Sequence, residues 1–328
     1  MMWMCFSAFS QDLTFSQFYE KPLLRNPALA GVFDGDIRIS GVHRNQWQSV
    51  TVPFQTSALS AELKFPLRWN DWITIGLQTT HDVAGDVKMS RTQLLPVINY
   101  HKSLSDDKDN FISMAFMGGI VNSQFDPTKL KMDEQFQNGS YNPGAPIQTF
   151  SRSGFTYWDA GTGLTYNSGF GEDSRYYVGA ALFHFNKPKV AFYTDNTSTT
   201  LTNKWVLNAG INAAMTEINR LIVFADLYIQ GGNKQLFGGA MYETVLSEYY
   251  DNADKFAFSV GGFYRWNDAF IPVVKLEMYK WTLGLSYDAN VSKLKTASNF
   301  RGGFELTATY KSAFTRRAYE SDKVRCHF

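Results

Sequence analysis

The chain has very little cysteine and no long hydrophobic run. Its 328 residues contain no stretch of about 18 apolar residues, which a helix needs to cross a bilayer. Its two cysteines, Cys5 and Cys326, lie at opposite ends and form no CxxC pair and no metal-binding spacing with the five histidines. These absences exclude a helical membrane protein and leave no cysteine motif for a metal.

The chain also has no excess of positive or negative charge. The 31 basic and 30 acidic residues give a net charge of +1, so no overall field favours a nucleic acid or an acidic polymer as partner. The histidines have no neighbouring Ser/Asp pattern, no His-Glu-x-x-His occurs, and no glycine-rich phosphate loop follows a strand. Asp106 and Asp107 lie in a polar turn, where solvated charges are expected rather than an acid/base pair. We expect no catalytic residue, metal or cofactor; a hydrolase assembled from distant residues is the weakest alternative.

Aromatic residues are abundant, and they fall on alternating segments. Phe, Tyr and Trp make up 16% of the chain. Near its end, Trp281, Leu283, Leu285 and Tyr287 alternate with polar or small residues, and residues 300–310 repeat the pattern. A period of two places apolar groups on one face of a strand and polar groups on the other. The apolar face points inward in a soluble sandwich and toward lipid in an outer-membrane barrel.

Fourteen such segments occur without a linker that would divide the chain. An even number of strands of roughly ten residues is typical of bacterial outer-membrane barrels. We therefore predict an all-β fold: a transmembrane barrel of about 14 antiparallel strands over residues 36–311, in contact with outer-membrane lipid. The least regular segments are 88–101, which contains Pro96, and 111–122, which has an apolar run. The predicted strands are 36–45, 56–65, 72–81, 88–101, 111–122, 155–167, 175–186, 204–216, 219–230, 235–246, 256–266, 269–278, 280–289 and 300–311.

The lengths of the connections indicate an orientation. With a periplasmic N-terminus, the odd-numbered connections face outside, and they include the long segments 123–154, 187–203 and 290–299. The even-numbered ones are mostly tight, as at 67–71 and 168–174. Long outside and short inside is the asymmetry of outer-membrane barrels.

Placing the apolar faces toward lipid directs charged residues of both signs into the lumen. They form either a self-neutralising interior that fixes register, or a filter or docking surface for an inserted segment. No ring of a single sign is visible, so a porin constriction is not indicated. The lumen candidates are Arg38, Arg44, Glu62, Lys64, Asp159, Asp226, Arg265, Lys275, Glu277, Asp288, Arg301 and Glu305.

Both ends of the chain lie outside the predicted barrel. Residues 1–10 resemble the remnant of a signal peptide that takes Cys5 with it, although a lipid-modified Cys5 is an alternative. Residues 11–35 are too polar and proline-rich for a strand, yet their aromatic and leucine side chains favour burial; they either plug the lower opening or pack against the wall. Residues 312–328 form a basic tail that is solvated or contacts a periplasmic partner, and Cys326 either bridges to a partner or stays free.

Several short motifs stand out along the chain: Phe15-Ser-Gln-Phe-Tyr19, Asn26-Pro-Ala-Leu-Ala-Gly31, His43-Arg-Asn-Gln-Trp47, Phe183-His-Phe-Asn-Lys-Pro188, Arg265-Trp-Asn-Asp-Ala-Phe-Ile-Pro272, Leu285-Ser-Tyr-Asp-Ala-Asn290, Arg301-Gly-Gly-Phe-Glu305 and Val324-Arg-Cys-His-Phe328. Together they resemble the PorP/SprF family, outer-membrane proteins of the Bacteroidetes type IX secretion and gliding systems. The family's tail usually reads Cys-Pro-Arg-Phe, so His327 is a departure. The resemblance marks as family-motif residues Asn26, Pro27, Gly31, Arg44, Gln46, Trp47, Asn186, Pro188, Asp268, Pro272, Ser286, Tyr287, Asp288, Gly302, Gly303 and Glu305.

The resemblance implies protein binding in secretion. An SprF-like member supports export and cell-surface retention of a large adhesin by binding its C-terminal domain. A PorP-like member instead links the outer membrane to the secretion motor through periplasmic lipoproteins and a peptidoglycan-binding protein. In either case the segments 123–154 and 187–203 with the lumen charges are expected to receive the exported domain, while 11–34 and 313–328 face the periplasm. A diffusion channel is the remaining alternative.

Overall fold

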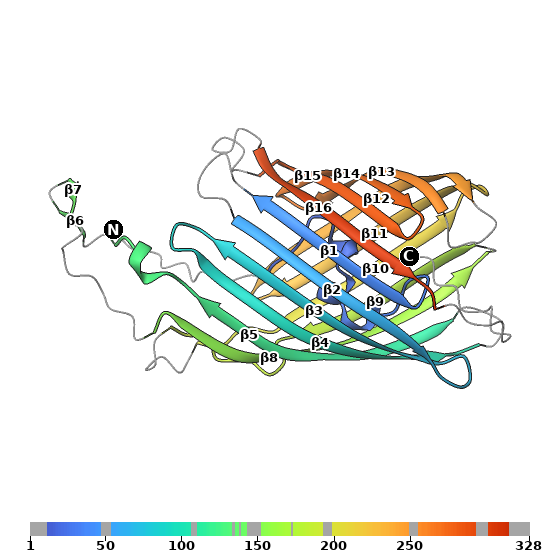
Figure 1. The fold of residues 1–328 in the computed structure, drawn as a ribbon, viewed down its shortest axis with the longest axis horizontal. Helices are drawn as coiled ribbons and strands as arrows, with labels where there is room; N and C mark the ends of the chain where they lie inside the picture. Colours follow the sequence, from blue (N-terminus) through green and yellow to red (C-terminus); the bar gives the residue numbers. More distant parts are fainter. Residues whose placement is uncertain are drawn as a thin grey trace.

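Fourteen strands close into one antiparallel barrel in the computed structural model (Figure 1). The structure describes residues 12–46, 54–105, 110–132, 135–137, 139–142, 152–171, 173–192, 199–248, 255–292 and 301–314. The predicted signal remnant, Trp47, Asp106, Asp107 and residues 315–328 of the basic tail lie outside these ranges. The barrel strands are β1 (Ile37–Gln46), β2 (Phe54–Pro66), β3 (Trp72–Ala84), β4 (Met89–Ser103), β5 (Phe111–Gln124), β8 (Gly154–Phe170), β9 (Ser174–Phe183), β10 (Lys204–Ala214), β11 (Asn219–Gln230), β12 (Asn233–Glu248), β13 (Lys255–Arg265), β14 (Ala269–Met278), β15 (Trp281–Asn290) and β16 (Arg301–Ser312).

The barrel closes by pairing its first strand with its last. Each strand pairs with its neighbours in the chain, and Ile37 of β1 lies opposite both Leu63 of β2 and Ser312 of β16. Each of the fourteen predicted segments overlaps one of these strands, so the predicted barrel and strand number are confirmed. Several boundaries differ by one to three residues. For example, β9 ends at Phe183 rather than Asn186, because His184 has a φ of 59°, which ends an extended strand.

The alternation of side chains has the predicted direction. Leu283, Leu285 and Leu306 are 43%, 52% and 49% exposed on the outside of the barrel. Thr282 and Glu305, on the same strands, are buried inside. Because the apolar face lies outside a closed barrel, it is the surface that lipid covers.

Pro96 is accommodated within β4. It faces outward, and the pairing of β4 with β5 passes from Leu94–Ile120 to Val97–Met117 without a partner for it there. Since proline has no N–H to donate, the ladder skips this position and continues.

The two ends of the barrel differ in their connections. The end after β1, β3, β5, β9, β11, β13 and β15 carries the stretches 125–153, 184–203 and 291–300, and we call it the long-connection end. It also carries η3 (Pro127–Lys129) and a small hairpin that was not predicted, β6 (Phe136–Gln137) with β7 (Ser140–Tyr141) (Figure 1). The opposite, short-connection end is joined by turns such as 67–71 and 279–280.

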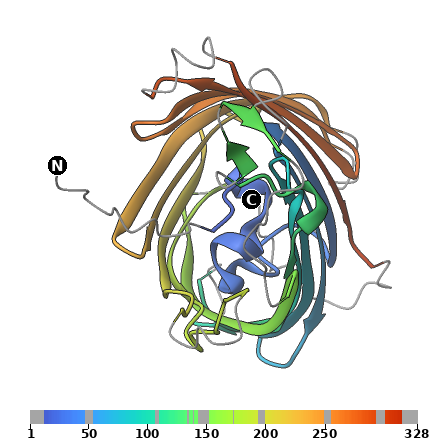
Figure 2. The same cartoon turned by 90° about the vertical axis from the view of Figure 1, so that its left-hand side faces the viewer.

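Residues 12–36, which we call the inner segment, lie inside the barrel (Figure 2, dark blue). The segment contains three short helices, η1 (Phe18–Glu20), α1 (Pro22–Arg25) and η2 (Pro27–Leu29). Within the described ranges, no helix has the length and apolar character needed to cross a membrane.

The inner segment runs the length of the lumen. Asp12 contacts Gln230, the last residue of β11, at the long-connection end. Asp36 contacts Ser312 and Phe314 at the other end. Residues 15–33 are mostly buried in the lumen, and Asp12 lies at the end opposite to Phe314. That residues 11–34 face periplasmic partners stays a prediction.

Candidate functional site in the occupied lumen

An aromatic cluster holds the first turn of the inner segment. The ring of Tyr19 stacks on Phe224 with centroids 5.1 Å apart and lies 4.9 Å from Phe263. Phe18 packs against Phe237 and Phe263 at 5.2 and 5.5 Å. Each aromatic pair adds roughly 0.5–1.5 kcal/mol beyond the burial of its area. The sequence predicted that the aromatic side chains between residues 11 and 35 would be buried. Phe18 and Tyr19 are buried against strands β11, β12 and β13.

A buried ion pair fixes the centre of the inner segment. The guanidinium of Arg25 donates to both carboxylate oxygens of Asp226 on β11, with Nε 2.6 Å from Oδ2. The same guanidinium lies over the rings of Phe18 and Phe224 at 5.0 and 5.4 Å. Both partners are almost inaccessible to solvent, so removal of either would leave an uncompensated charge in the lumen.

Glu305 on β16 binds the main chain of the inner segment. Its carboxylate accepts hydrogen bonds from the backbone N–H groups of Ser16 and Gln17, at 2.8 and 2.7 Å. The Gln17 amide donates in turn to the Glu305 carbonyl at 3.1 Å. A carboxylate that accepts hydrogen bonds from two backbone N–H groups binds them strongly. This motif residue therefore uses its carboxylate to bind the inner segment.

Asparagines of the wall surround η2. Asn99 donates to the carbonyls of Ala28 and Ala30, both at 2.8 Å. Asn26 caps η2 by accepting from the Ala28 N–H at 2.9 Å, and its amide donates to Asn208 at 3.1 Å. A methyl group at Gly163 of β8 would overlap the side-chain oxygen of Asn26. The wall is therefore shaped to this part of the segment as well as bonded to it.

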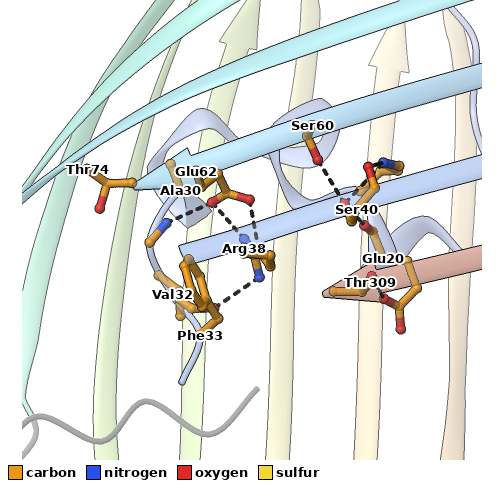
Figure 3. Close-up of polar contacts among 12 residues, drawn as sticks. Glu20, Ala30, Val32, Phe33, Arg38, Ser40, Ser60, Glu62, Thr74 and Thr309 are labelled. Atoms are coloured by element: carbon orange, nitrogen blue, oxygen red, sulfur yellow. Dashed lines mark hydrogen bonds and ion pairs between the residues drawn. The ribbon is translucent and has the colours of Figure 1, made fainter. Parts of the chain in front are cut away.

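Near the short-connection end, Glu62 of β2 joins the wall to the segment (Figure 3). It pairs with Arg38 of β1 through two bonds of 2.8 Å and accepts from the Gly31 N–H at 2.9 Å. Lys64 donates to the carbonyl of Phe33. In the same view, Thr309 of β16 contacts the carboxylate of Glu20 at 3.3 Å.

Four motif residues meet in one ionic network beside the start of the segment. Arg44 and Arg265 both donate to Asp288 Oδ2, at 2.8 and 2.9 Å, and Arg265 also pairs with Asp268. Arg44 donates in addition to the carbonyl of Thr14. The network ties β1, β13 and β15 together across 244 residues of chain.

A second ionic cluster holds Asp12 at the long-connection end. His184 Nε2 lies 2.7 Å from one carboxylate oxygen, Arg91 Nη1 lies 2.9 Å from the other, and Lys204 Nζ is 3.5 Å away. The second ring nitrogen of His184 faces Asp159 at 2.7 Å. Burial opposes the imidazolium, but the two carboxylates outweigh it and raise the pKa of His184 to about 9. The three cations likewise overcome burial and hold the pKa of Asp12 well below its usual range.

The predicted residues divide into those that meet the inner segment and those that do not. Arg38, Arg44, Glu62, Lys64, Asp226 and Glu305 contact it, as does Lys275, whose ammonium is 2.6 Å from Glu20. Pro272 and Tyr287 face outward, Asn186 and Pro188 lie in the connection after β9, and Gln46, Gly302 and Gly303 lie at strand ends. Ser286 is buried on β15, and the side chain of Arg301 lies outside what the structure describes.

Several residues that form the contacts of the segment were not among the candidates. Two had a usable signal: Arg25 directly precedes the motif that begins at Asn26, and His184 lies within the motif from Phe183 to Pro188. Others carry no local signal, because their partners are between 69 and 218 residues away; they include Asp12, Arg91, Asn99 and Lys204.

A cavity of about 590 Å³ remains beside the segment. Its lining includes Glu217, Glu277 and Lys280 from the short-connection end together with Glu20 and Arg25 of the inner segment. Charges of both signs line it. In the part of the chain that the structure describes, no group of three or more histidine, cysteine, aspartate or glutamate side chains is arranged to hold a metal ion.

Solved structures similar to this one are outer-membrane barrels. The CymD monoaromatic hydrocarbon channel has a TM-score of 0.47 at 9% identity, over 90% of this chain and 94% of that chain. The translocator domain of the autotransporter NalP from Neisseria meningitidis has a TM-score of 0.42 at 9% identity, over 90% and 95% of the two chains. A FadL homologue from Pseudomonas aeruginosa has a TM-score of 0.41 at 11% identity, over 87% and 92%. A comparison with curated protein sequences finds no match.

A family model described as type IX secretion system membrane protein PorP/SprF matches residues 7–310. The match covers the inner segment and nearly the whole barrel, and it includes all the motifs that carry the resemblance except the last, at residues 324–328. The chain therefore belongs to the PorP/SprF family of type IX secretion system membrane proteins and is an outer-membrane protein.

Proposed function

We propose that this barrel supports export and cell-surface retention of a large adhesin-type protein by binding its C-terminal domain at the long-connection end. That end faces outside if the barrel follows the usual asymmetry of connection lengths. The lumen residues considered as docking candidates bind the barrel's own inner segment, as Asp226 and Glu305 do. The connections are then the larger surface left for a partner.

The observation that carries this proposal is an exposed aromatic hairpin in the connection after β5. Phe136 of β6 and Tyr141 of β7 are 56% and 41% exposed, with ring centroids 5.4 Å apart. At the start of the same connection, Phe125 packs against Phe192 with centroids 5.0 Å apart, and Phe192 packs against Phe155 at 4.8 Å, which joins the connection after β5 to the one after β9. Exposed aromatic side chains are enriched at protein interfaces.

The proposed role is non-enzymatic. The PorP/SprF family consists of secretion-system membrane barrels and is not a known enzyme family. The charged groups of the lumen are engaged in ion pairs and main-chain contacts, which supports a structural and binding role for them.

The test is surface display of the adhesin in cells that carry a double substitution, Phe136→Ala with Tyr141→Ala. We expect adhesin to be lost from the surface while the amount of barrel in the outer membrane is unchanged. The matched control is Tyr279→Ala, since Tyr279 is also 56% exposed but lies in a turn at the short-connection end. Normal display in the double variant would contradict the proposal.

A PorP-like link to the periplasmic motor is the second candidate, because the cavity beside the inner segment opens among residues of the short-connection end. In that case Tyr279→Ala, or Trp69→Ala in the turn after β2, should impair secretion and the hairpin variant should not. Co-purification separates the two roles: an adhesin C-terminal domain supports the first, and periplasmic lipoproteins with a peptidoglycan-binding protein support the second.

The diffusion-channel alternative is tested by conductance. Because the inner segment occupies the lumen, we expect purified protein to conduct little in planar bilayers. Removal of residues 12–33 should raise the conductance. High conductance of the unaltered protein would favour a channel.

A further inference from the structure

The wall around Asp12 forms a pocket of three cations, which we call the mouth pocket. It consists of Arg91 from β4, His184 directly after β9 and Lys204 from the start of β10. All three converge on the Asp12 carboxylate within 2.7–3.5 Å. The pocket belongs entirely to the barrel wall, and Asp12 is its ligand.

The cations of the mouth pocket are held in place by the wall itself. Asp159 contacts one nitrogen of the His184 ring and so directs the other toward the ligand. The Lys204 ammonium lies 5.4 and 5.2 Å from the rings of Phe183 and Tyr228. His184 and Lys204 are buried, so the positions of their charged groups do not depend on solvent.

The pocket also contacts the main chain of its ligand. The side-chain oxygen of Gln230, at the end of β11, accepts the backbone N–H of Asp12 at 3.0 Å. A carboxylate and the N–H of the same residue are therefore bound together. This pair of groups is what an aspartate in an extended segment presents.

Asp12 lies at the accessible edge of the inner segment. Residues 12–14 are half-buried, and the Asp12 side chain is 13% exposed, whereas the chain is buried from Phe15 onward. The aromatic cluster, the Arg25–Asp226 pair and the Glu305 bonds all lie beyond this edge. None of these contacts involves Asp12, so they do not depend on its place in the pocket.

We propose that the mouth pocket is a receptor for an aspartate side chain of the exported partner, and that Asp12 occupies it until the partner's aspartate takes its place. The identity of the partner rests on the proposed function, whereas the carboxylate chemistry of the pocket does not. Exchange at this point would anchor an extended acidic segment of the partner beside the connection after β9.

The pocket is tested first by emptying it. Asp12→Gly removes the carboxylate, and we expect a lower unfolding temperature of the purified protein in detergent because three cations lose their counter-charge. Sodium acetate should restore at least half of this loss, while sodium chloride at the same ionic strength should not. Acetate should have no such effect on the unaltered protein.

Two further experiments make the result specific. Lys204→Met in the Asp12→Gly background should abolish the response to acetate. The Asp12→Gly protein, whose pocket is empty, should bind an N-acetylated and C-amidated Gly-Asp-Gly peptide at least tenfold more tightly than a Gly-Asn-Gly peptide capped in the same way. Equal responses to acetate and chloride, or equal affinity for the two peptides, would overturn the proposal that the mouth pocket binds a carboxylate.

The partner's use of the pocket is tested separately, by adhesin display in cells carrying Lys204→Met. We expect display to fall. Normal display together with an acetate response in Asp12→Gly would overturn the exchange but leave the proposed function standing, because the hairpin variant tests that function independently.

Discussion

The two parts of the inner segment are held in opposite ways. From Phe15 to Phe33 the chain is mostly buried, and it is held by stacked rings, a buried ion pair and wall residues that bind its main chain. From Asp12 to Thr14 it is half-buried, and ionic groups bind its side chain and carbonyl. The centre of the segment is therefore held by packing as well as by charge, whereas contact at the long-connection end depends mainly on charge.

The largest effect is expected where the centre is broken. Asp226→Ala leaves Arg25 charged and buried without its partner, which costs about 3–5 kcal/mol of unfolding free energy. Denaturant titration in detergent measures it. The double variant Arg25→Met with Asp226→Leu should recover most of the loss, because an apolar pair needs no counter-charge. If the double variant is as unstable as the single one, the charge is not the cause.

Alkaline pH should weaken the ionic contacts of Asp12 at the long-connection end. The pKa of His184 is raised from 6.5 to about 9, so its stabilisation is complete below about pH 6.5 and is lost as the pH rises through 9. The charged groups that face His184 are the carboxylates of Asp12 and Asp159, with the cations Arg91 and Lys204 on the other side of Asp12. The loss amounts to at most about 3 kcal/mol.

The prediction is checked by measuring the free energy of unfolding from pH 6 to pH 10, where it should fall as the pH rises. His184→Gln keeps a hydrogen-bonding side chain without the titration, and it should flatten the profile in that range. An identical slope in both proteins would assign the pH dependence to other groups.

A smaller effect is expected where the wall is shaped to the centre. In Gly163→Ala the added methyl group overlaps Asn26, and overpacking of this kind costs about 1–3 kcal/mol. Protease digestion between residues 15 and 33 should become faster. Gly238→Ala is the control, since its methyl group would meet nothing closer than 3.9 Å and should leave digestion unchanged.

The smallest effect is expected for Arg91→Gln at the edge. The Arg91 side chain is 18% exposed, and two other cations remain on Asp12. We expect a loss of less than about 1 kcal/mol, which high salt should reduce further. A loss as large as that of Asp226→Ala would erase the distinction between the two parts.

The wall was predictable and its contents were not. Alternation over residues such as Leu283, Leu285 and Leu306 is a local property of the chain, so the strands, their number and the direction of their faces follow from it. The same alternation directed Asp226 and Glu305 into the lumen. It could not show that their partners are Arg25 and the main chain of Ser16, because those contacts join residues 201 and 289 positions apart.

The site near Asp12 was hidden for a further reason. His184 reaches it from a left-handed conformation that ends β9, and no turn residue marks that position in the sequence. The family motifs included His184 but gave no role to it.

The junction between the inner segment and β1 has a consequence for assembly. Residue 36 leads from the lumen directly into β1, and β1 forms the final seam of the ring with β16. The side chains of Phe18, Tyr19 and Arg25 are buried against the wall on the far side of the lumen from this seam. We therefore expect the inner segment to take its position before the seam between β1 and β16 closes around it.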